Sequence, residues 1–541
     1  MFERQDLIKK AESKFTETER VNVETLWQEL SEFIMNNQSN GFNGTKSPGS
    51  KLNRRVYDST ADKANRDFAA AIHATLTNPA TKWSKIRFKD EELNNNEEAV
   101  NWIQKVNDRI HEKLAESNFD SQIAKGYQSY TALGNMVLLH EQKDESSIAF
   151  SGFKFNALHL GEVAFCENNE GIADTLYRRF KMTAKQIAEQ FEMIPDVIRS
   201  ALESKKEDEK FEIFHCVYPR PAREVNLDVT ATPKERPYAS IYILKKGGHV
   251  LEETGFYEVP FYATRFMVGP GEVYGRGPGH VALPDIRSLN KIIELNLQAL
   301  AKAVNPPILA DQRSMLSNLN IRPGQVSVVR DINGLKEMTS QARFDIVQIT
   351  IQEYRTLIKE YFYLDKLLLP PRTETGEMTA YEVATRVEQL NRVLGPVLSR
   401  LNYELLQPLI VRCFKMMLRG GALPPLPAIL QERGIDVNIN FVNPLARSQQ
   451  IEDVTNIQAW VQEVAMLAQL KPEVLDYVDA DAIAKFTANI RNVPEIAVTN
   501  DPQVKQAREA RQQQMEQQQQ MQQTMGLADV ASKTGGLGSG Q

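Results

Sequence analysis

The sequence has few cysteines, no long apolar run and no excess of positive charge. Its three cysteines, Cys166, Cys216 and Cys413, lie far apart among 541 residues and match no zinc or disulfide spacing. We expect them to be reduced and to serve as small buried side chains in an intracellular setting. No apolar stretch approaches the ~18 residues that a membrane span requires, and the polar, charged first ten residues do not form a secretory signal. We therefore expect a cytoplasmic chain without a membrane span.

The charge balance argues against a protein whose main task is to hold DNA tightly. The net charge is −6, from 64 Lys and Arg against 70 Asp and Glu. Tight non-specific binders carry basic surfaces that displace counterions from phosphate. An acidic protein can still handle DNA that must slide past it, so the charge alone does not exclude contact with nucleic acid.

Signatures of catalysis, metal binding and cofactor binding are also missing. None of the seven histidines forms the i, i+4 pair typical of zinc sites, and no Gly-x-Ser-x-Gly elbow occurs. Residues 41–47 superficially resemble a phosphate-binding loop, but Thr45 separates the second glycine from the lysine. Gly275, Gly277 and Gly279 precede a helix at the wrong spacing for a dinucleotide fingerprint. We expect no catalytic residue, no metal and no cofactor.

The sequence has an ordinary globular composition, with 42% hydrophobic and 25% charged residues. Its periodicities predict an α+β fold that is predominantly helical. A capping box of Thr183 and Gln186 predicts one further helix start. The predicted strands are 136–141, 147–153, 163–167, 175–180, 211–218, 240–245, 261–266, 325–329 and 435–441. The predicted helices are two within 2–36, then 60–78, 97–117, 284–304, 344–363, 379–420, 448–470 and 472–490.

One stretch, residues 271–304, organises the rest of the chain. Its glycines predict a tight turn, and Pro284 is expected at the first position of a helix that Pro306 and Pro307 stop. The helix carries one apolar stripe at spacings of three and four. The stripe consists of Ile286, Leu289, Ile293, Leu297, Leu300 and Val304.

A second helix, predicted over 344–363, carries a matching stripe. Residues 345–351 are rich in β-branched side chains and also fit a strand, but the stripe continues beyond them and favours a helix. The two helices flank a small module and would form a stalk with a tip. The second stripe consists of Val347, Ile351, Tyr354, Ile358 and Tyr361.

The segments after the stalk are a proline-rich loop, 364–378, and a long helix, 379–420. Thr379 and Glu382 form a capping box at its start, and Gly420 and Gly421 end it. Pro396 and Pro408 are expected to bend it. The Gln-rich segment 503–523 and the tail after it contain little to bury.

Several phrases, in order along residues 54–444, resemble the portal proteins, or head-to-tail connectors, of short-tailed (podovirus-type) bacteriophages. The N-terminal arm and the Gln-rich end lie outside this resemblance. The phrases are VYDSTA at 56–61, residues 171–179, Tyr274 to Pro278, Asp285-Ile286, Leu289-Asn290 and residues 378–414.

The resemblance implies a ring, usually of twelve subunits, at one vertex of the virion capsid, assembled in the host cytoplasm. Double-stranded DNA would pass through its axis without sequence reading during packaging and ejection. The implied partners are capsid and scaffolding proteins, the terminase large subunit and a tail adaptor. The implied parts are an N-terminal helical arm and loop (1–53), wing (54–282), first stem helix (283–304), clip (305–342), second stem helix (343–363), tunnel loop (364–378), long kinked helix (379–420), C-terminal wing and crown (421–502) and Gln-rich tail (503–541).

Within this scheme the sequence nominates two sets of residues. Lys366 and Arg372 in the tunnel loop would present cations to passing phosphates, with simple solvation as the alternative. The stem stripes would mediate ring assembly, with an intramolecular core as the alternative. The assembly residues are Ile286, Leu289, Ile293, Leu297, Leu300, Val347, Ile351, Tyr354 and Ile358.

Two other classes of protein are weighed against the portal. A packaging nucleotide enzyme needs a phosphate loop, which the sequence lacks. A tail adaptor or internal head protein is another virion structural protein, but adaptors are generally shorter and lack the series of stalk, loop and kinked helix.

Overall fold

The computed structural model describes residues 4–35, 42, 56–94, 96–144, 149–226, 231–306, 308–310, 335–337, 344–367, 394–433, 437–441, 444–468, 471–490 and 508. The chain divides into two compact units, residues 1–445 and 446–541, which are described separately. Helix and sheet are mixed, in agreement with the predicted α+β class. The predicted strand 325–329, Arg372, the start of the long helix and nearly all of the Gln-rich end lie outside the described residues.

The largest sheet of the first unit has five antiparallel strands in the order β4-β5-β6-β7-β8. The predictions contain four of these strands but not β8. That strand lies at the sheet edge and carries Glu252 and Glu253, and acidic residues are uncommon within strands but typical of edges. The strands are β4 (Val163–Glu167), β5 (Ala173–Thr183), β6 (Lys210–Pro219), β7 (Tyr238–Leu244) and β8 (His249–Phe256).

Helices cover both faces of this sheet. α1 (Arg4–Thr16) packs on one face, where it meets Phe214 and Cys216 of β6. α7 (Ala184–Gln190) and α8 (Asp196–Glu203) pack on the other face, where they meet Phe211 and Ile213. The alternation along β6 places successive side chains on opposite faces. The capping box predicted at Thr183 is present at the start of α7.

His215 and Cys216 face opposite sides of β6, as predicted. The His215 ring stacks on Tyr242 with centroids 3.9 Å apart, and its Nε2 lies 2.9 Å from the Ser240 hydroxyl oxygen. Burial lowers the pKa of His215 to about 3, so the ring is neutral. Burial also raises the pKa of the Cys216 thiol to about 12. Both residues act as packing side chains.

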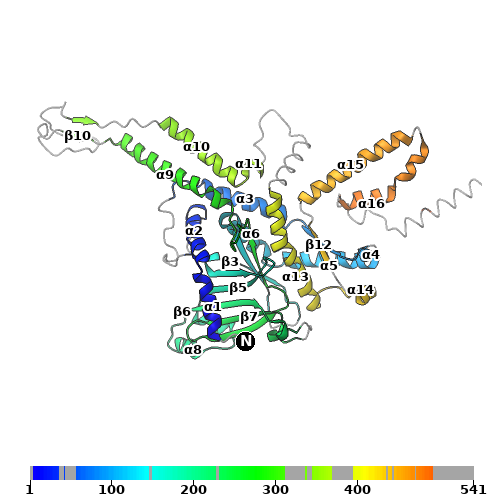
Figure 1. Ribbon diagram of the computed structural model, residues 1–541, viewed down its shortest axis with the longest axis horizontal. Coiled ribbons are helices and arrows are strands. Elements are labelled where there is room, and N and C mark those ends of the chain that lie inside the picture. The colour runs from blue at the N-terminus through cyan, green and yellow to red at the C-terminus, as the bar shows by residue number, and fades with distance from the viewer. Residues whose placement is uncertain are drawn as a thin grey trace, which may run out of the picture. The chain divides into compact units, whose positions relative to one another are not determined.

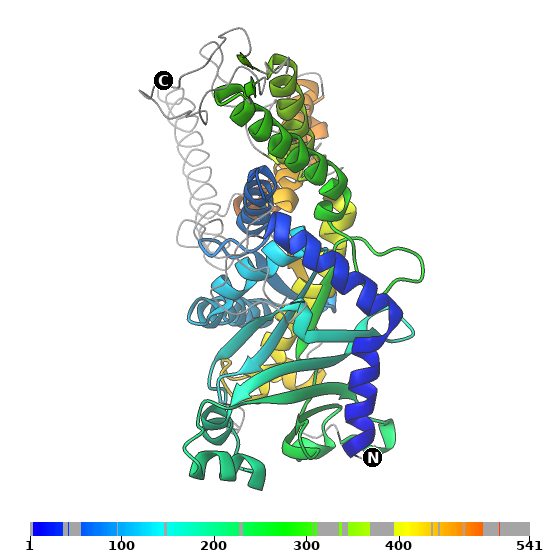
Figure 2. The ribbon, with the colours of Figure 1, turned by 90° about the vertical axis from the view of Figure 1, so that its left-hand side faces the viewer.

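The N-terminal helices belong to the core of the first unit. α1 and α2 (Thr18–Ile34) are broken at Glu17, within the predicted break, and run in blue from the sheet toward α9 in Figure 2. Arg20 is fully buried and donates to the carbonyl oxygens of Val163 at 3.2 Å and Leu160 at 3.0 Å. Trp27 donates to the Leu133 carbonyl at 3.1 Å. Arg20 thus joins α2 to β4 of the five-stranded sheet, and Trp27 joins it to the end of the helix that closes at Leu133.

Two smaller sheets connect distant parts of the chain. The first has the order β3-β2-β9, with β2 (Asn135–Gln142), β3 (Phe153–Leu158) and β9 (Phe261–Arg265). The prediction of a strand at 147–153 is wrong. Gly152 has φ +115°, outside the range of a regular strand, and β3 begins only after it, at Phe153. The second pairs β1 (Ser84–Phe88), which was not predicted, with β12 (Val437–Phe441), which was.

Helices between these sheets complete the main hydrophobic core. The predicted helices at 60–78 and 97–117 are confirmed as α3 (Thr60–Leu76) and α5 (Glu97–Ala115), with a short α4 (Glu91–Asn94) before α5. α6 (Phe119–Leu133) is absent from the predictions. It contains Gly126, whose low helix propensity weakens the signal, and a Cβ there would lie 2.6 Å from the sulfur of Met136.

Two long helices, α9 (Pro278–Val304) and α10 (Phe344–Tyr361), pack against each other and form what we call the helical arm (Figure 1). The second agrees with its prediction. The first begins six residues earlier than predicted, so the expectation that no helix begins before Pro284 is wrong. Pro278 takes the first helical position instead, and Pro284 lies inside the helix, where it has no backbone N–H to donate. β10 (Ile308–Ala310) and β11 (Leu335–Glu337) pair beyond α9.

The chain after the arm contains an irregular helix. The predicted loop starts with a short helix, α11 (Leu364–Leu367). Residues 394–401 are helical and continue through a π turn, Asn402–Leu406, into α13 (Gln407–Arg419). The π turn ends next to Pro408, the site of a predicted bend, where the missing N–H removes a regular helical bond. Gly421, with φ +67°, follows the helix end as predicted.

The remaining short helices of the first unit lie between these elements. They are α14 (Ala428–Arg433) and three 3₁₀ turns, Leu160–Glu162, Ala222–Glu224 and Pro233–Glu235.

The second unit contains most of α15 (Pro444–Ala468), a 3₁₀ turn (Pro472–Tyr477) and α16 (Ala480–Ile490). The single helix predicted at 472–490 is therefore wrong. It is divided because the Asp479 carboxylate accepts from the N–H of Ala482 at 3.0 Å and starts a new helix. Across the residues that the structure describes, no helix combines the length and the apolar character needed to span a bilayer.

Candidate functional site at the base of the helical arm

The glycine-rich turn between β9 and α9 lies directly against the end of α6. A Cβ on Gly275 would lie 2.7 Å from the Gly134 carbonyl oxygen, and one on Gly277 would lie 2.9 Å from the Gly134 Cα. A Cβ on Gly279 would clash with the Ala132 carbonyl. Only glycine allows backbones to approach this closely. The three glycines are thus explained by a crossing of two backbone segments.

Polar side chains from distant elements fix this turn. Asn135 donates to the Gly275 carbonyl at 2.7 Å and accepts from the Gly275 N–H at 2.8 Å. Glu19, on α2, accepts from the N–H groups of Val273 at 2.8 Å and Tyr274 at 3.3 Å. The turn is therefore bonded to both the central strand β2 and the N-terminal helix.

His280 caps the start of α9. Its Nδ1 accepts from the Gly277 N–H at 3.1 Å, which requires an unprotonated nitrogen. Burial, together with the nearby charge of Arg276, lowers the pKa of His280 to about 4. The imidazole is neutral near pH 7 and serves as the acceptor that the first turn of the helix needs.

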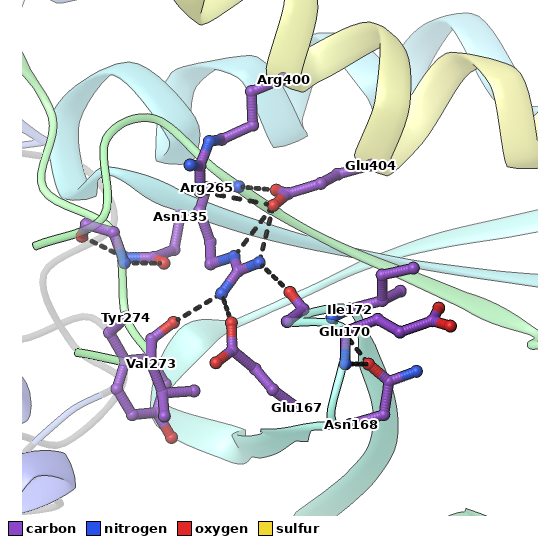
Figure 3. A network of polar contacts seen from close by, with 12 residues as sticks. Asn135, Glu167, Asn168, Glu170, Ile172, Arg265, Val273, Tyr274, Arg400 and Glu404 are labelled. Carbon is purple, nitrogen blue, oxygen red and sulfur yellow. Dashed lines mark hydrogen bonds and ion pairs between the residues drawn. The ribbon is translucent and has the colours of Figure 1, made fainter. Parts of the chain in front are cut away.

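Arg265, at the end of β9, is the centre of an ionic network beside the turn (Figure 3). Its Nε and Nη2 donate to one oxygen of Glu404 at 3.2 and 2.7 Å, and its backbone N–H donates to the other at 2.8 Å. Its Nη2 also donates to the Gly171 carbonyl at 2.8 Å. Its Nη1 donates to Glu167 and, at 3.3 Å, to the Val273 carbonyl. All five guanidinium N–H groups are used.

The network connects the two sheets, the glycine-rich turn and the π turn. The Arg265 side chain is 3% exposed and that of Glu404 is 9% exposed. Burial acts to lower the pKa of Arg265, but the hydrogen bonds and charges of Glu404 and Glu167 outweigh burial and raise it. A hollow of about 840 Å³ beside the network is also lined by Pro396, Arg400 and Tyr403.

A second polar cluster anchors the arm itself. The Asn290 amide oxygen accepts from the N–H groups of Tyr57 at 2.7 Å and Asp58 at 3.2 Å. Arg355, on α10, donates to Asp58 at 2.8 and 3.0 Å. Burial acts to raise the pKa of Asp58, but hydrogen bonds from Thr60 and Arg355 and the Arg355 charge outweigh it, so the pKa is lowered. The segment before α3 thus holds both arm helices.

The phrases that carry the family resemblance meet at this place. Tyr57 and Asp58 belong to one phrase and bond to Asn290 of another. Tyr274 is buried and packs edge-on against Trp27, with ring centroids 5.4 Å apart. Asp285 accepts a hydrogen bond from the Tyr361 hydroxyl, which raises the pKa of that tyrosine. Each phrase therefore contributes a contact at the base of the arm.

The proposed assembly residues fall into two groups by burial. Those nearest the base lie in the core of their own chain, namely Ile286, Leu289, Ile293, Ile351 and Ile358, with Val347 and Tyr354 partly buried beside them. Leu297 and Leu300 continue the same stripe but are 49% and 48% exposed. Val304, at the end of α9, is 79% exposed. The base of the arm is an intramolecular core, and the side chains of its far half are exposed among the described residues.

The two proposed channel residues are not brought together. Lys366 lies in α11, and its side chain is not described, whereas Arg372 lies outside the described residues. The residues that sequence reasoning missed are Arg265, Glu404, Asp58 and Arg355. Arg265 and Glu404 are 139 positions apart, and no local pattern pairs them. Glu404, Asp58 and Asn290 lie within the phrases that resemble portal proteins, and that resemblance was the signal that could have found them.

The chemistry of this site is that of a structural joint. No group of three or more His, Cys, Asp or Glu residues within the described ranges could hold a metal ion. The charges are used to join elements, and the neutral His280 caps a helix.

Comparison with known proteins gives a consistent result. A family model described as bacteriophage head to tail connecting protein matches residues 5–498. The match therefore includes the N-terminal arm and most of the C-terminal helices, and the limits of 54 and 444 inferred for the resemblance are too narrow. Arg20 and Trp27 of α2 are buried, so the N-terminal helices are part of the folded first unit, in agreement with a family match that starts at residue 5.

Individual relatives cover most of the chain. The portal protein of Salmonella phage epsilon15 is 27% identical over 500 residues, 91% of this chain and 88% of that protein. The probable portal protein of Bordetella phage BPP-1 is 28% identical over 494 residues, 89% and 86% of the two chains. A solved structure described as the neck of a native GTA particle computed with C12 symmetry covers 74% of this chain and 85% of its own, with TM-score 0.36 and 11% identity.

Proposed function

Because the chain belongs to the bacteriophage head to tail connecting protein family, we propose that its copies close into a ring at one vertex of the capsid and form the channel through which the genome passes. The function is that of a phage portal, or head-to-tail connector. The observation that carries it is the family match over residues 5–498, supported by portal relatives that cover about nine tenths of the chain. The role is structural, and no catalytic step is part of it.

We assign the parts of the chain as the resemblance implies. The sheets and helices from 54 to 282 form the wing, the helical arm forms the stem, and residues 305–342 form the clip. Residues 364–378 form the tunnel loop, 379–420 the kinked helix and 421–502 the C-terminal wing and crown. The N-terminal arm, 1–53, joins the wing, since α1 packs on the five-stranded sheet. Residues 503–541 form the Gln-rich tail.

The stem stripes contribute to assembly in two ways. Ile286, Leu289, Ile293, Ile351 and Ile358 hold the two helices and the wing together within one chain. Leu297 and Leu300, which nothing in the described chain covers, face a neighbouring copy. Val347 and Tyr354, being partly buried, lie between these two environments. A head-to-tail interface repeated by rotation closes into a ring. We propose twelve subunits for the ring of this chain, the number that is usual for the portal family.

Lys366 and Arg372 are proposed as channel cations of the tunnel loop. In a ring they would present circles of positive charge that contact phosphate without reading sequence. Changing both to Ala should leave rings and procapsids intact and alter DNA translocation or retention in a salt-dependent way. Normal packaging and retention across a range of salt concentrations would remove both residues from the mechanism.

The partners are those of a connector. Capsid and scaffolding proteins would surround the wing, whereas the terminase large subunit and later a tail adaptor would dock on the clip. Assembly would occur in the host cytoplasm and the product would be a component of the virion.

Electron microscopy of the purified full-length chain tests this function. The expected result is a ring with a central hole, and native mass spectrometry should then give its subunit number. Two results together would contradict the proposal. The chain would remain monomeric at micromolar concentration, and phage particles would assemble in its absence.

A further inference from the structure

α10 carries a second stripe that is distinct from its buried one. Ile346, Ile349, Glu353, Leu357 and Glu360 recur at spacings of three, four, four and three. At 100° per residue this stripe lies about a third of a turn away from the one containing Ile351 and Ile358. Ile346, Ile349 and Leu357 are 47%, 62% and 41% exposed. The stripe is therefore apolar, uncovered and interrupted only by two acids.

α9 carries a corresponding stripe of opposite charge. Lys291, Leu295, Ala299 and Lys302 recur at spacings of four, four and three, about half a turn from the buried stripe. Leu295 is 51% exposed. Lys291 is 63% exposed, and its one ion pair within the described ranges is with Glu294 of its own helix, at 2.9 Å. Lys302 is exposed and has no ion-pair partner among the described residues.

Both stripes have the composition of a contact surface, and no described residue of the chain is seen to cover them. Within the described residues, Glu353 and Glu360 form no ion pair, although basic Arg355 and Lys359 lie on the same helix. Arg355 is used elsewhere, since it pairs with Asp58. Exposed apolar residues that recur at helical spacing indicate a partner helix.

A second copy of the chain fits this requirement on both sides. A ring closed by rotation places one surface of each subunit against a different surface of the next. If the α10 stripe met itself, acids would face acids, and if the α9 stripe met itself, lysines would face lysines. Only the pairing of the α10 stripe with the α9 stripe brings opposite charges together around the apolar residues.

We propose that the acidic stripe of α10 in one copy docks on the basic stripe of α9 in the next copy. This interface rests on the ring proposed above and names the surfaces that close it. Lys291 and Glu353 lie at similar levels along the arm, counted from the contact of Asp285 with Tyr361 at its base. Lys291 lies six residues and Glu353 eight residues from that contact, a difference of about 3 Å in height at 1.5 Å per residue. Glu360 lies near the base and Lys302 near the far end of α9, so these two residues add to the charge of their stripes without facing each other.

Charge-reversal variants test this pairing. Glu353→Lys with Glu360→Lys makes both stripes basic, and Lys291→Glu with Lys302→Glu makes both acidic. Each double variant alone should lose its rings at a concentration where the parent chain is fully assembled, as measured by native mass spectrometry. The chain with all four changes should form rings again, because its stripes are complementary with the signs exchanged.

Mixing the two double variants gives a sharper result. The basic α10 stripe of one fits the acidic α9 stripe of the other, and the reverse contact fits as well. The mixture should form rings in which the two variants alternate in equal numbers, which requires an even subunit count. Lys359→Glu serves as the matched control, since Lys359 is exposed on another face of α10, and it should leave rings unchanged.

The outcomes separate this interface from the ring itself. If the parent chain forms rings and both double variants do so equally well, the stripe pairing is wrong and the portal function stands. If neither the mixture nor the fourfold variant recovers rings, the charges do not face each other and the pairing is again wrong. If the parent chain forms no ring, the proposed function fails first. Chains that are merely unfolded would not be recovered by mixing, so recovery excludes that explanation.

Discussion

A single guanidinium, that of Arg265, joins the end of β9 to β4, the Gly171 turn, the glycine-rich turn and the π turn. Two carboxylates and two carbonyls accept its five N–H groups, so its charge and its planar geometry are both used. Removing one partner of a buried pair leaves an uncompensated charge, which is more costly than the pair was worth. The joint between the two sheets, the glycine-rich turn and the π turn should therefore be sensitive to changes at Arg265.

Replacement of Arg265 by Lys should destabilise the chain although the charge is kept. Lysine has three donors on one nitrogen and cannot reach Glu404, Glu167 and both carbonyls together. We expect a loss of about 2–4 kcal/mol in the free energy of unfolding, measured by denaturant titration. Arg276→Lys is the matched control, because Arg276 is 63% exposed and pairs only with Glu272. Equal stability of the two variants would show that the fork geometry of Arg265 is not needed.

His280 should contribute to loss of stability in acid. Its pKa is about 4 in the folded chain against an ordinary 6.5, so between these values the unfolded chain binds a proton that the folded chain does not. Stability from this group is complete above pH 6.5 and falls as the pH drops toward 4, by at most about 3 kcal/mol. His280→Gln, which supplies an amide acceptor that does not titrate, should show a shallower decline of the thermal midpoint over that range. Curves that stay parallel from pH 7 to 4 would contradict the assignment.

At the scale of elements, α9 of the helical arm carries one continuous apolar stripe. The half of this stripe near the base is buried, and the far half is exposed. Leu289 and Leu300 are eleven residues, or about three turns, apart and so lie on the same face of α9, but Leu289 is 1% exposed and Leu300 is 48% exposed. The difference arises from the body of the molecule, because α6 and the segment before α3 reach only the base of α9. Periodicity identifies the face of a helix, whereas burial depends on how far the neighbouring elements extend.

The two halves of the arm should respond differently to an introduced charge. Ile358→Asp places a carboxylate at a fully buried site and should lower the stability of the chain itself by about 3 kcal/mol or more. Leu300→Asp changes a side chain that is 48% exposed and should leave the fold of the chain intact while impairing ring formation. Circular dichroism reports the first effect and native mass spectrometry the second. Intact rings from the Leu300 variant would exclude the face of α9 that carries Leu297 and Leu300 from the subunit interface.

The sequence allowed the long amphipathic helices and most strands to be predicted, because those signals are local. The start of α9 could not be decided in this way, since Pro278 and Pro284 both satisfy the rule for a first helical residue. What decides it is the contact of Gly277 with Gly134, far away in the chain. The pairing of Arg265 with Glu404 and of β1 with β12 has the same origin, so the joint at the base of the arm was beyond local reasoning.

At the scale of the whole molecule, the two units, residues 1–445 and 446–541, can be considered separately for the apolar surface that they expose. The family match ends at residue 498, before the Gln-rich tail. The second unit exposes Trp460, Tyr477 and Phe486, the tyrosine at 80%. Such exposure is unusual for a unit that stands alone and agrees with a chain that functions in an assembly.

Deletion of residues 503–541 should leave both folding and ring size unchanged. This segment has almost no apolar periodicity, so it has little to bury against the rest of the chain. Thermal unfolding and native mass spectrometry of the shortened chain should match those of the parent. A lower melting temperature, or a different subunit number, would mean that the tail packs as part of the assembly.

The pairing of β1 with β12 has a consequence for the order of events during synthesis. Ile86 pairs with Ile439, so this sheet forms only when nearly the whole polypeptide has left the ribosome. Contacts between such distant segments carry a large entropic cost of loop closure and make folding slow. The strand that completes the first unit is thus made more than four hundred residues after α1. A nascent chain, or one that ends before residue 437, lacks β12 and cannot form this sheet. An incomplete subunit therefore differs from a finished one in leaving β1 unpaired.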